Sequence, residues 1–163
     1  MPLNPLQLQN ALLRLSTTER PVSGTEAALK LAQAYQQYAA AGSALGFPLA
    51  TGGPGMAGMA AGLISAFNIS PGAPPLVAQG FASMLAAFWG GAVFTGVPFP
   101  GIAAPPVATP ALLASLTALL SNPANTAPVY AAQMAAALDA CTRTVLVSFP
   151  QVPPAPPLVG PVL

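Results

Sequence analysis

The chain has 163 residues, the length of one ordinary domain, which is enough to bury a sizeable core. Charged residues make up only 4% of it, against about 25% in a typical soluble protein, and none lies between Lys30 and Asp139. With four basic residues, no histidine and one cysteine, the chain lacks the side chains that bind nucleic-acid phosphates or hold metal ions.

Acid–base chemistry has equally little material, because the only acidic side chains are Glu19, Glu26 and Asp139. We therefore expect no enzyme activity, no catalytic residue, no cofactor, no metal ligand and no small-molecule substrate. The net charge of +1 and the shortage of charged side chains favour association with neighbours. Two environments suit such a chain, namely a protein assembly and a lipid bilayer.

The first third of the chain predicts two helices. An apolar periodicity predicts a short helix over residues 6–15, and a polar loop follows. Ser23 and Glu26 match the S-x-x-E capping box, in which the two side chains satisfy free N–H groups at a helix start. That helix is expected to end near residue 41, before Gly42. Tyr35 and Tyr38 share one of its faces, which we interpret as an interface stripe with the hydroxyls directed to water or a backbone partner.

The rest of the chain predicts four more helices, a loop, one strand and an arm. The helices are expected over residues 56–67, 76–89, 110–120 and 127–141, with breaks at residues 70–75, 90–91 and 121–123. Residues 93–107 indicate a loop with a short extended piece, residues 142–149 a single strand, and residues 150–157 a polyproline-type segment. The predicted fold class is mostly α: Ala-rich helical hairpins with one short C-terminal strand and an extended Pro-rich arm. Residues 1–149 are expected to form a single helical domain and residues 150–163 the arm.

The predicted helix pairs align with one another. A shift of 50 residues places Ala28 on Ala78, and a further shift of 53 places Ala78 on Ala131. Either a repeated helical hairpin or the alanine content that all these helices share explains the alignment.

A bilayer and a protein assembly make different demands on the apolar segments. Residues 76–94 are uncharged and long enough to approach a membrane span, and Gly58 and Gly62 form a small-xxx-small pattern. Prolines interrupt these segments, however, and no Lys/Arg cluster flanks them. Assembly is therefore the preferred interpretation and a small membrane-embedded protein, such as a minor membrane protein of a virion or a pore former, is the alternative. A third hypothesis, a carrier of apolar ligands, requires a persistent cavity.

Several residues are expected to serve packing and contacts with partners. The apolar residues of the tail (Val152, Leu158, Val159, Val162 and Leu163) predict an arm that lies on a neighbouring subunit, and residues 142–147 predict a strand added to a partner's sheet. Cys141 is interpreted as a small packed side chain, and Phe88 and Trp89 as core or interface. Asp139 and Arg143, four residues apart, are expected to pair. We find no secretory signal pattern at the N-terminus.

The Ala-rich helical units, the missing charges and the stretch Thr142-Arg143-Thr144-Val145 running into the proline tail resemble a small structural protein of a tailed-phage or contractile-tail particle. This resemblance implies a multi-copy subunit at a head, neck or tail position, without catalytic residues. The implied partners are copies of itself and other structural proteins of the particle, not nucleic acid. The implied location is a virion assembled in the host cytoplasm, with a membrane as the alternative. The composition is also similar to mycobacterial PE/PPE proteins, but their N-terminal Pro-Glu signatures are absent.

Overall fold

A computed structural model describes residues 3–51, 53–68, 73–90, 92–152 and 155–163. Residues 70–72 of the predicted break, Gly91, and Pro153–Pro154 of the predicted arm lie outside the described residues.

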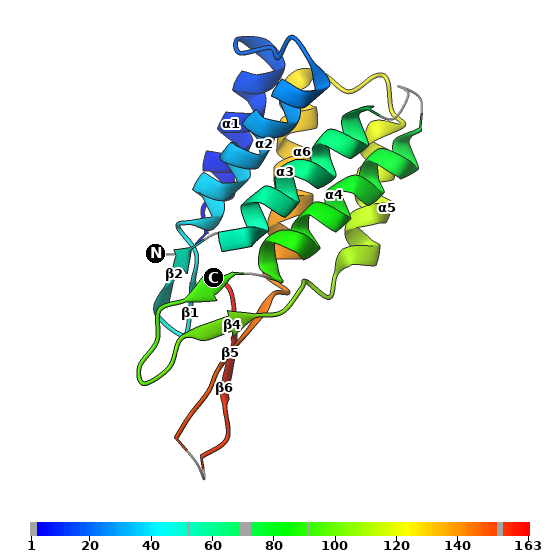
Figure 1. Ribbon diagram of the computed structural model, residues 1–163. Coiled ribbons are helices and arrows are strands. Elements are labelled where there is room, and N and C mark those ends of the chain that lie inside the picture. The colour runs from blue at the N-terminus through cyan, green and yellow to red at the C-terminus, as the bar shows by residue number, and fades with distance from the viewer. Residues whose placement is uncertain (1–2, 52, 69–72, 91, 153–154) are drawn as a thin grey trace.

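The described chain repeats one arrangement, two helices followed by a β-hairpin, three times. The first unit contains α1 (Pro5–Thr17), α2 (Gly24–Ala39), β1 (Ser43–Ala44) and β2 (Phe47–Thr51). The second contains α3 (Gly53–Asn68), α4 (Pro74–Trp89), β3 (Val93–Phe94) and β4 (Gly101–Ala103), and the third contains α5 (Thr109–Leu120), α6 (Ala127–Thr142), β5 (Leu146–Phe149) and β6 (Leu158–Pro161). The helices lie side by side in one bundle, and the strands lie together at one end of it (Figure 1).

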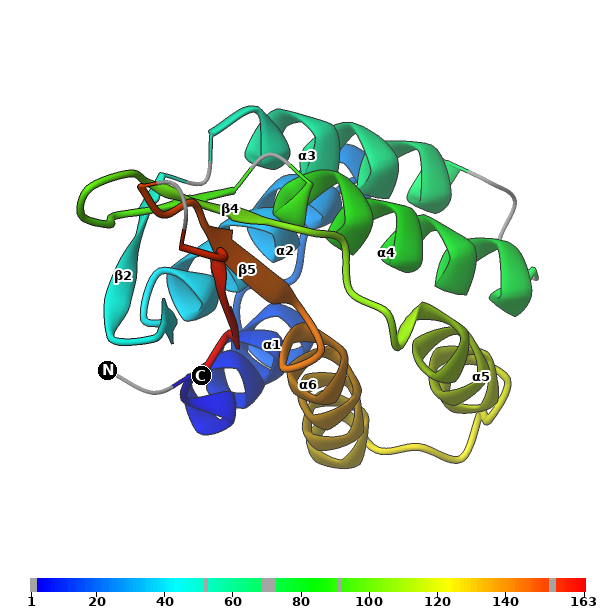
Figure 2. The ribbon, with the colours of Figure 1, turned by 90° about the horizontal axis from the view of Figure 1, so that it is seen from below.

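The helices form a ring. Each packs against its neighbour in chain order, and α1 packs against α6 to complete the circle, as the view along the helices shows (Figure 2). The second helix of each unit contributes most of the buried residues, because α2, α4 and α6 turn more of their surface inward. The core therefore lies along the axis of the ring and continues into the sheet.

Local sequence explains where the helices begin. Proline occupies the first turn of α1, α4, α5 and α6, where its missing N–H costs nothing and its fixed φ favours the helix. The Ser23 half of the predicted capping box at α2 is confirmed, because Ser23 Oγ accepts the Glu26 N–H at 3.1 Å; Glu26 Oε2 instead accepts the Val22 N–H at 2.8 Å. The carboxylate therefore satisfies the N–H of the residue before Ser23 and not the N–H of Ser23 itself.

The strands form a nearly closed antiparallel sheet in the order β1-β2-β3-β4-β5-β6. Ala44 bridges to Val162, and the backbones of Ser43 and Leu163 exchange two hydrogen bonds of 3.2 and 2.9 Å. This contact brings the last residues of the chain beside β1, so the first and last strands meet. A barrel-like sheet of this kind pairs the backbone groups that an open edge would expose.

The predicted fold class is therefore wrong. The chain is a mixed α and β structure with six strands in the described residues, not a helical body with one strand. Residues 142–145 end α6 and turn into β5, and β5 pairs with β4 and β6 of the same chain. It therefore adds to its own sheet, not to a partner's. Residues 158–161 of the predicted Pro-rich arm are β6, paired along their whole length with β5.

The sequence pattern does not predict the β-hairpins, because their strands are only two to five residues long. Such strands are too short to display an alternation, and the intervening Gly and Pro residues read as loop. In the first hairpin, Leu45 and Gly46 both have positive φ, 51° and 85°, as a two-residue type I′ turn requires.

The burial pattern supports a structural repeat. Residues 28–44 and 78–94 have the same burial class at every position described in both, and residues 131–147 follow nearly the same pattern. The shifts of 50 and 53 residues thus relate the second helices of the three units (α2, α4 and α6) and the strands that follow them. Between the first helices of the first two units, α1 and α3, the shift is 51, because it brings buried Leu8 and Leu12 onto buried Met59 and Leu63.

The small residues of α3 and α4 serve contact between these two helices. A Cβ on Gly58 would meet Ala87 at 3.1 Å, and a Cβ on Gly80 would meet the Cβ of Ala66 at 2.2 Å. The small-xxx-small pattern thus allows two helices of the same chain to approach closely. Among the described residues, no helix is both long and apolar enough to cross a membrane.

Candidate interaction surface

The outer face of the sheet carries a row of exposed apolar side chains. The strand register pairs Ile102 with Ser148 and Ser148 with Val159, which places these residues in line across β4, β5 and β6. Leu146 lies two residues from Ser148 and therefore on the same face. The exposed fractions of Ile102, Leu146 and Val159 are 59%, 45% and 55%. These side chains cover the outside of the sheet without a partner element among the described residues.

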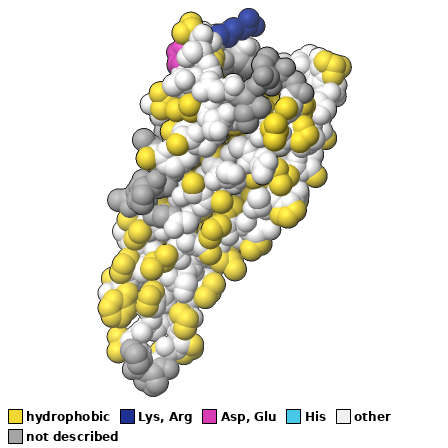
Figure 3. Space-filling model, turned by 45° about the vertical axis from the view of Figure 1, so that its right-hand side comes forward, with side chains coloured by type: hydrophobic (Ala, Val, Ile, Leu, Met, Phe, Trp, Pro, Cys, Tyr) yellow, Lys and Arg dark blue, Asp and Glu magenta, His cyan; other side chains and the backbone are white. Residues whose placement is uncertain are grey.

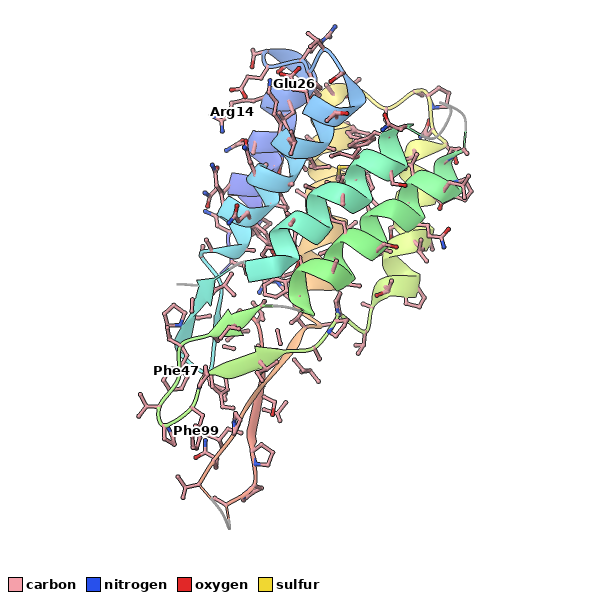
Figure 4. All side chains as sticks on the ribbon, viewed as in Figure 1. Arg14, Glu26, Phe47 and Phe99 are labelled. Atoms are coloured by element: carbon pink, nitrogen blue, oxygen red, sulfur yellow. The ribbon has the colours of Figure 1, made fainter. Side chains whose placement is uncertain are left out.

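Neighbouring residues extend this apolar area toward the tips of the hairpins. Val97 and Phe99, between β3 and β4, and Leu158, at the start of β6, are all exposed. Figure 4 places Phe99 at the end of the molecule remote from Arg14 and Glu26. We call the set Val97, Phe99, Ile102, Leu146, Leu158 and Val159 the sheet-end surface.

Most of the charged side chains lie at the opposite end. Arg14, Glu19, Arg20, Glu26 and Lys30 come from α1, α2 and the loop between them, and the dark blue and magenta side chains of Figure 3 gather there. Lys30 Nζ lies 2.9 Å from Glu26 Oε1, and this contact holds the pKa of Glu26 below its usual value. The strands and the 95–100 loop contain no charged residue in their sequence. The sheet-end surface is therefore apolar without any charged side chain from its own segments.

The remaining two charges pair with each other, as expected. Arg143 Nε donates to Asp139 Oδ2 at 2.8 Å, and this hydrogen bond raises the pKa of Arg143. The Tyr38 hydroxyl donates to Asp139 Oδ1. Burial, and then the bond to Asp139, raise the pKa of Tyr38 well above its ordinary value. The carboxylate thus joins α2 to α6.

The interpretation of Tyr35 and Tyr38 as an interface stripe is wrong. Both side chains are fully buried, and their hydroxyls bond to other side chains, not to water or backbone. Tyr35 Oη accepts the Trp89 indole N–H at 2.9 Å and lies 2.6 Å from Thr142 Oγ1. Burial raises the pKa of Tyr35. Among the described residues, no fully buried side-chain nitrogen or oxygen is left without a hydrogen bond, so this cluster is a satisfied core network.

The other residues singled out in the sequence divide between core and surface. Cys141 is buried, and burial raises the pKa of its thiol to about 11, so little thiolate forms at neutral pH. Phe88 and Trp89 lie in the core with their ring centroids 5.0 Å apart. Of the apolar tail residues, Val162 is buried beside Ala44, whereas Leu158 and Val159 are exposed.

Sequence reasoning missed Val97, Phe99 and Ile102 as surface residues. They fall in the segment interpreted as a loop, where prolines and glycines separate the apolar residues. The signal that identifies this segment as a hairpin is its position: it follows the second helix pair as residues 43–51 follow the first.

A scan against protein-family models, a search of curated proteins and a search of solved structures each find no match to this chain.

Proposed function

We propose that this chain is a non-enzymatic structural subunit that associates in several copies through its sheet-end surface. The observation that carries this proposal is the separation of apolar and charged surface. Two copies that bring their sheet-end surfaces together bury apolar side chains without desolvating any charged side chain of the strands. The particle that the sequence resemblance implies is a tailed-phage or contractile-tail virion, with other structural proteins as further partners.

The nearly closed sheet favours one mode of contact between the copies. Because β1 and β6 meet, strand addition at a free edge is not the mode of contact that we propose. Instead, side chains on the outer face pack against those of the next copy. Burying apolar area contributes on the order of 25 kcal/mol per 1,000 Å² before the costs of association.

Light scattering behind a sizing column, without detergent and over a range of concentrations, tests the proposal. We expect a discrete oligomer for the natural chain. Ile102→Lys and Val159→Lys each place a charge in the interface and are expected to weaken association at least tenfold. Leu29→Lys is the matched control, because Leu29 is as exposed as Leu146 but lies on α2.

Two outcomes contradict the proposal. One is a monomer at every concentration, and the other is loss of the oligomer in Leu29→Lys but not in the two sheet variants. The membrane alternative predicts that the chain is recovered only in detergent micelles and sediments with lipid vesicles. Since no charge pair holds the proposed contact, raising the salt from low to molar concentration is expected to leave the oligomer intact.

A further inference from the structure

An apolar cavity opens at the end of the helix ring opposite the sheet. It has a volume of about 160 Å³. Leu31, Phe81 and Met134 line it from α2, α4 and α6, and all three are buried. They occupy equivalent positions of the repeated units, related by the shifts of 50 and 53 residues. The cavity therefore lies where α2, α4 and α6 face one another across the axis of the ring. Leu12 and Phe67 complete its wall.

The volume and the lining match a small aromatic molecule. A protein cavity of about 150 Å³ lined by Leu, Ile and Phe stays dry and binds benzene. The present cavity has a similar size and lining, but it is open to solvent on one side. Its residues come from five of the helices and from the α1–α2 loop, so the packing of the ring holds the walls in place. Larger ligands, such as fatty acids or sterols, exceed this volume.

One polar group adds specificity. Tyr130 lines the cavity from the first turn of α6. Its hydroxyl makes no hydrogen bond to the described residues and, since no fully buried oxygen among them is left unpaired, it remains accessible to solvent at the cavity. Burial raises the pKa of this phenol, so the hydroxyl stays protonated at neutral pH. A protonated hydroxyl can both donate and accept a hydrogen bond. Ser16, the other hydroxyl of the lining, already donates to the Leu13 carbonyl at 2.9 Å.

We propose that this cavity binds one small neutral aromatic molecule with a single hydrogen-bonding substituent, of the size of phenol. The ring of the ligand packs between Phe81, Leu31 and Met134, and its substituent bonds to the Tyr130 hydroxyl. The site is independent of the sheet-end surface, which lies at the other end of the molecule, so this proposal stands or falls separately from the proposed assembly.

Titration with phenol and with toluene, followed by calorimetry and by the shift in Tm, tests the proposal. We expect both probes to bind at one site per chain. Ala27 lines the cavity and is partly exposed, so Ala27→Phe fills the space without entering the core. It is expected to weaken both probes at least tenfold. Leu29→Phe adds the same ring to the exposed face of α2 and is expected to leave binding unchanged.

Tyr130→Phe tests the polar contact. Loss of a hydrogen bond of about 1 kcal/mol is expected to weaken phenol about fivefold and to leave toluene unchanged. The proposal is overturned if neither probe binds at millimolar concentration, or if Ala27→Phe binds both as the natural chain does while its circular dichroism spectrum is unchanged. Equal effects of Tyr130→Phe on both probes overturn the hydrogen bond to the substituent.

Discussion

The buried hydroxyls of Tyr35 and Thr142 lie 2.6 Å apart, although their positions in the chain differ by 107. The direction of this hydrogen bond follows from its neighbours. The Trp89 indole can only donate, and it donates to Tyr35 Oη. Thr142 donates its own proton to the Leu138 carbonyl at 2.7 Å, so Tyr35 must donate to Thr142. One directed chain of hydrogen bonds therefore links α2, α4 and α6.

Replacement of Thr142 tests this chain. Thr142→Val keeps the shape of the side chain but leaves the buried Tyr35 proton without an acceptor. Such a loss costs about 1–3 kcal/mol of unfolding free energy. Thr142→Ser keeps the hydroxyl and loses one methyl group, so the expected cost is about 1 kcal/mol or less. Urea denaturation measures both values, and equal destabilisation by Val and Ser would contradict the assigned hydrogen bond.

The buried tyrosines make stability sensitive to alkaline pH. The pKa of Tyr35 and of Tyr38 is raised in the folded chain above the unfolded value of about 10, mainly by burial. Each phenol therefore stabilises the fold fully below pH 10, and this stabilisation is lost as the pH rises through the folded pKa. We expect these two phenols together to lower the free energy of unfolding by up to about 3 kcal/mol per pH unit above pH 10, because in the unfolded chain they release two protons that the folded chain retains.

Absorbance at 295 nm provides the matching control. In strong denaturant all three tyrosines should ionise near pH 10. The folded chain should show no comparable rise at that pH, since the pKa of Tyr130 is raised as well. Ionisation of the folded chain near pH 10 would show that the hydroxyls reach water.

The close approach of α3 and α4 predicts opposite effects of alanine at Gly80 and at Gly62. A Cβ on Gly80 would lie 2.2 Å from the Cβ of Ala66, so Gly80→Ala must push the helices apart, at an expected cost of about 1–3 kcal/mol. Gly62 lies on the facing helix, but a Cβ there would meet atoms only at 3.7 Å or more. Gly62→Ala should therefore stabilise the chain by up to about 1 kcal/mol through helix propensity. Thermal unfolding of the two variants measures opposite signs if this packing is right.

Removal of residues 158–163 distinguishes a strand from a free arm. The structure predicts a loss of about 3 kcal/mol or more, because β5 loses its partner strand and buried Val162 is deleted. Leu163→Ser is the control: its side chain is exposed and lies outside the sheet-end surface, so the change should stay within about 0.5 kcal/mol. An unchanged urea midpoint of the truncated chain would favour an arm that makes no contact with its own sheet.

The helices could be predicted from the sequence because their signals are local. Ser23 and Glu26 are three residues apart, and prolines in the first turn mark other helix starts. The pairing of Asp139 with Arg143 is local in the same way, being one helical turn long. The shifts of 50 and 53 residues that align Ala28, Ala78 and Ala131 could also be found in the sequence, because they equal the spacing between successive helix pairs.

Tertiary structure decided the pairing of the sheet, the cavity and the burial of Tyr35 and Tyr38. Strand β1 is two residues long, and the sheet closes through its bridge to Val162, which lies far away in the chain. Sequence periodicity cannot report a pairing of that kind, because each partner alone is too short to carry a pattern. By itself the sequence determined a chain of Ala-rich helices with almost no charge. Closure of the ring then set which apolar faces are buried and which remain on the sheet-end surface, since burial depends on what the rest of the chain brings alongside.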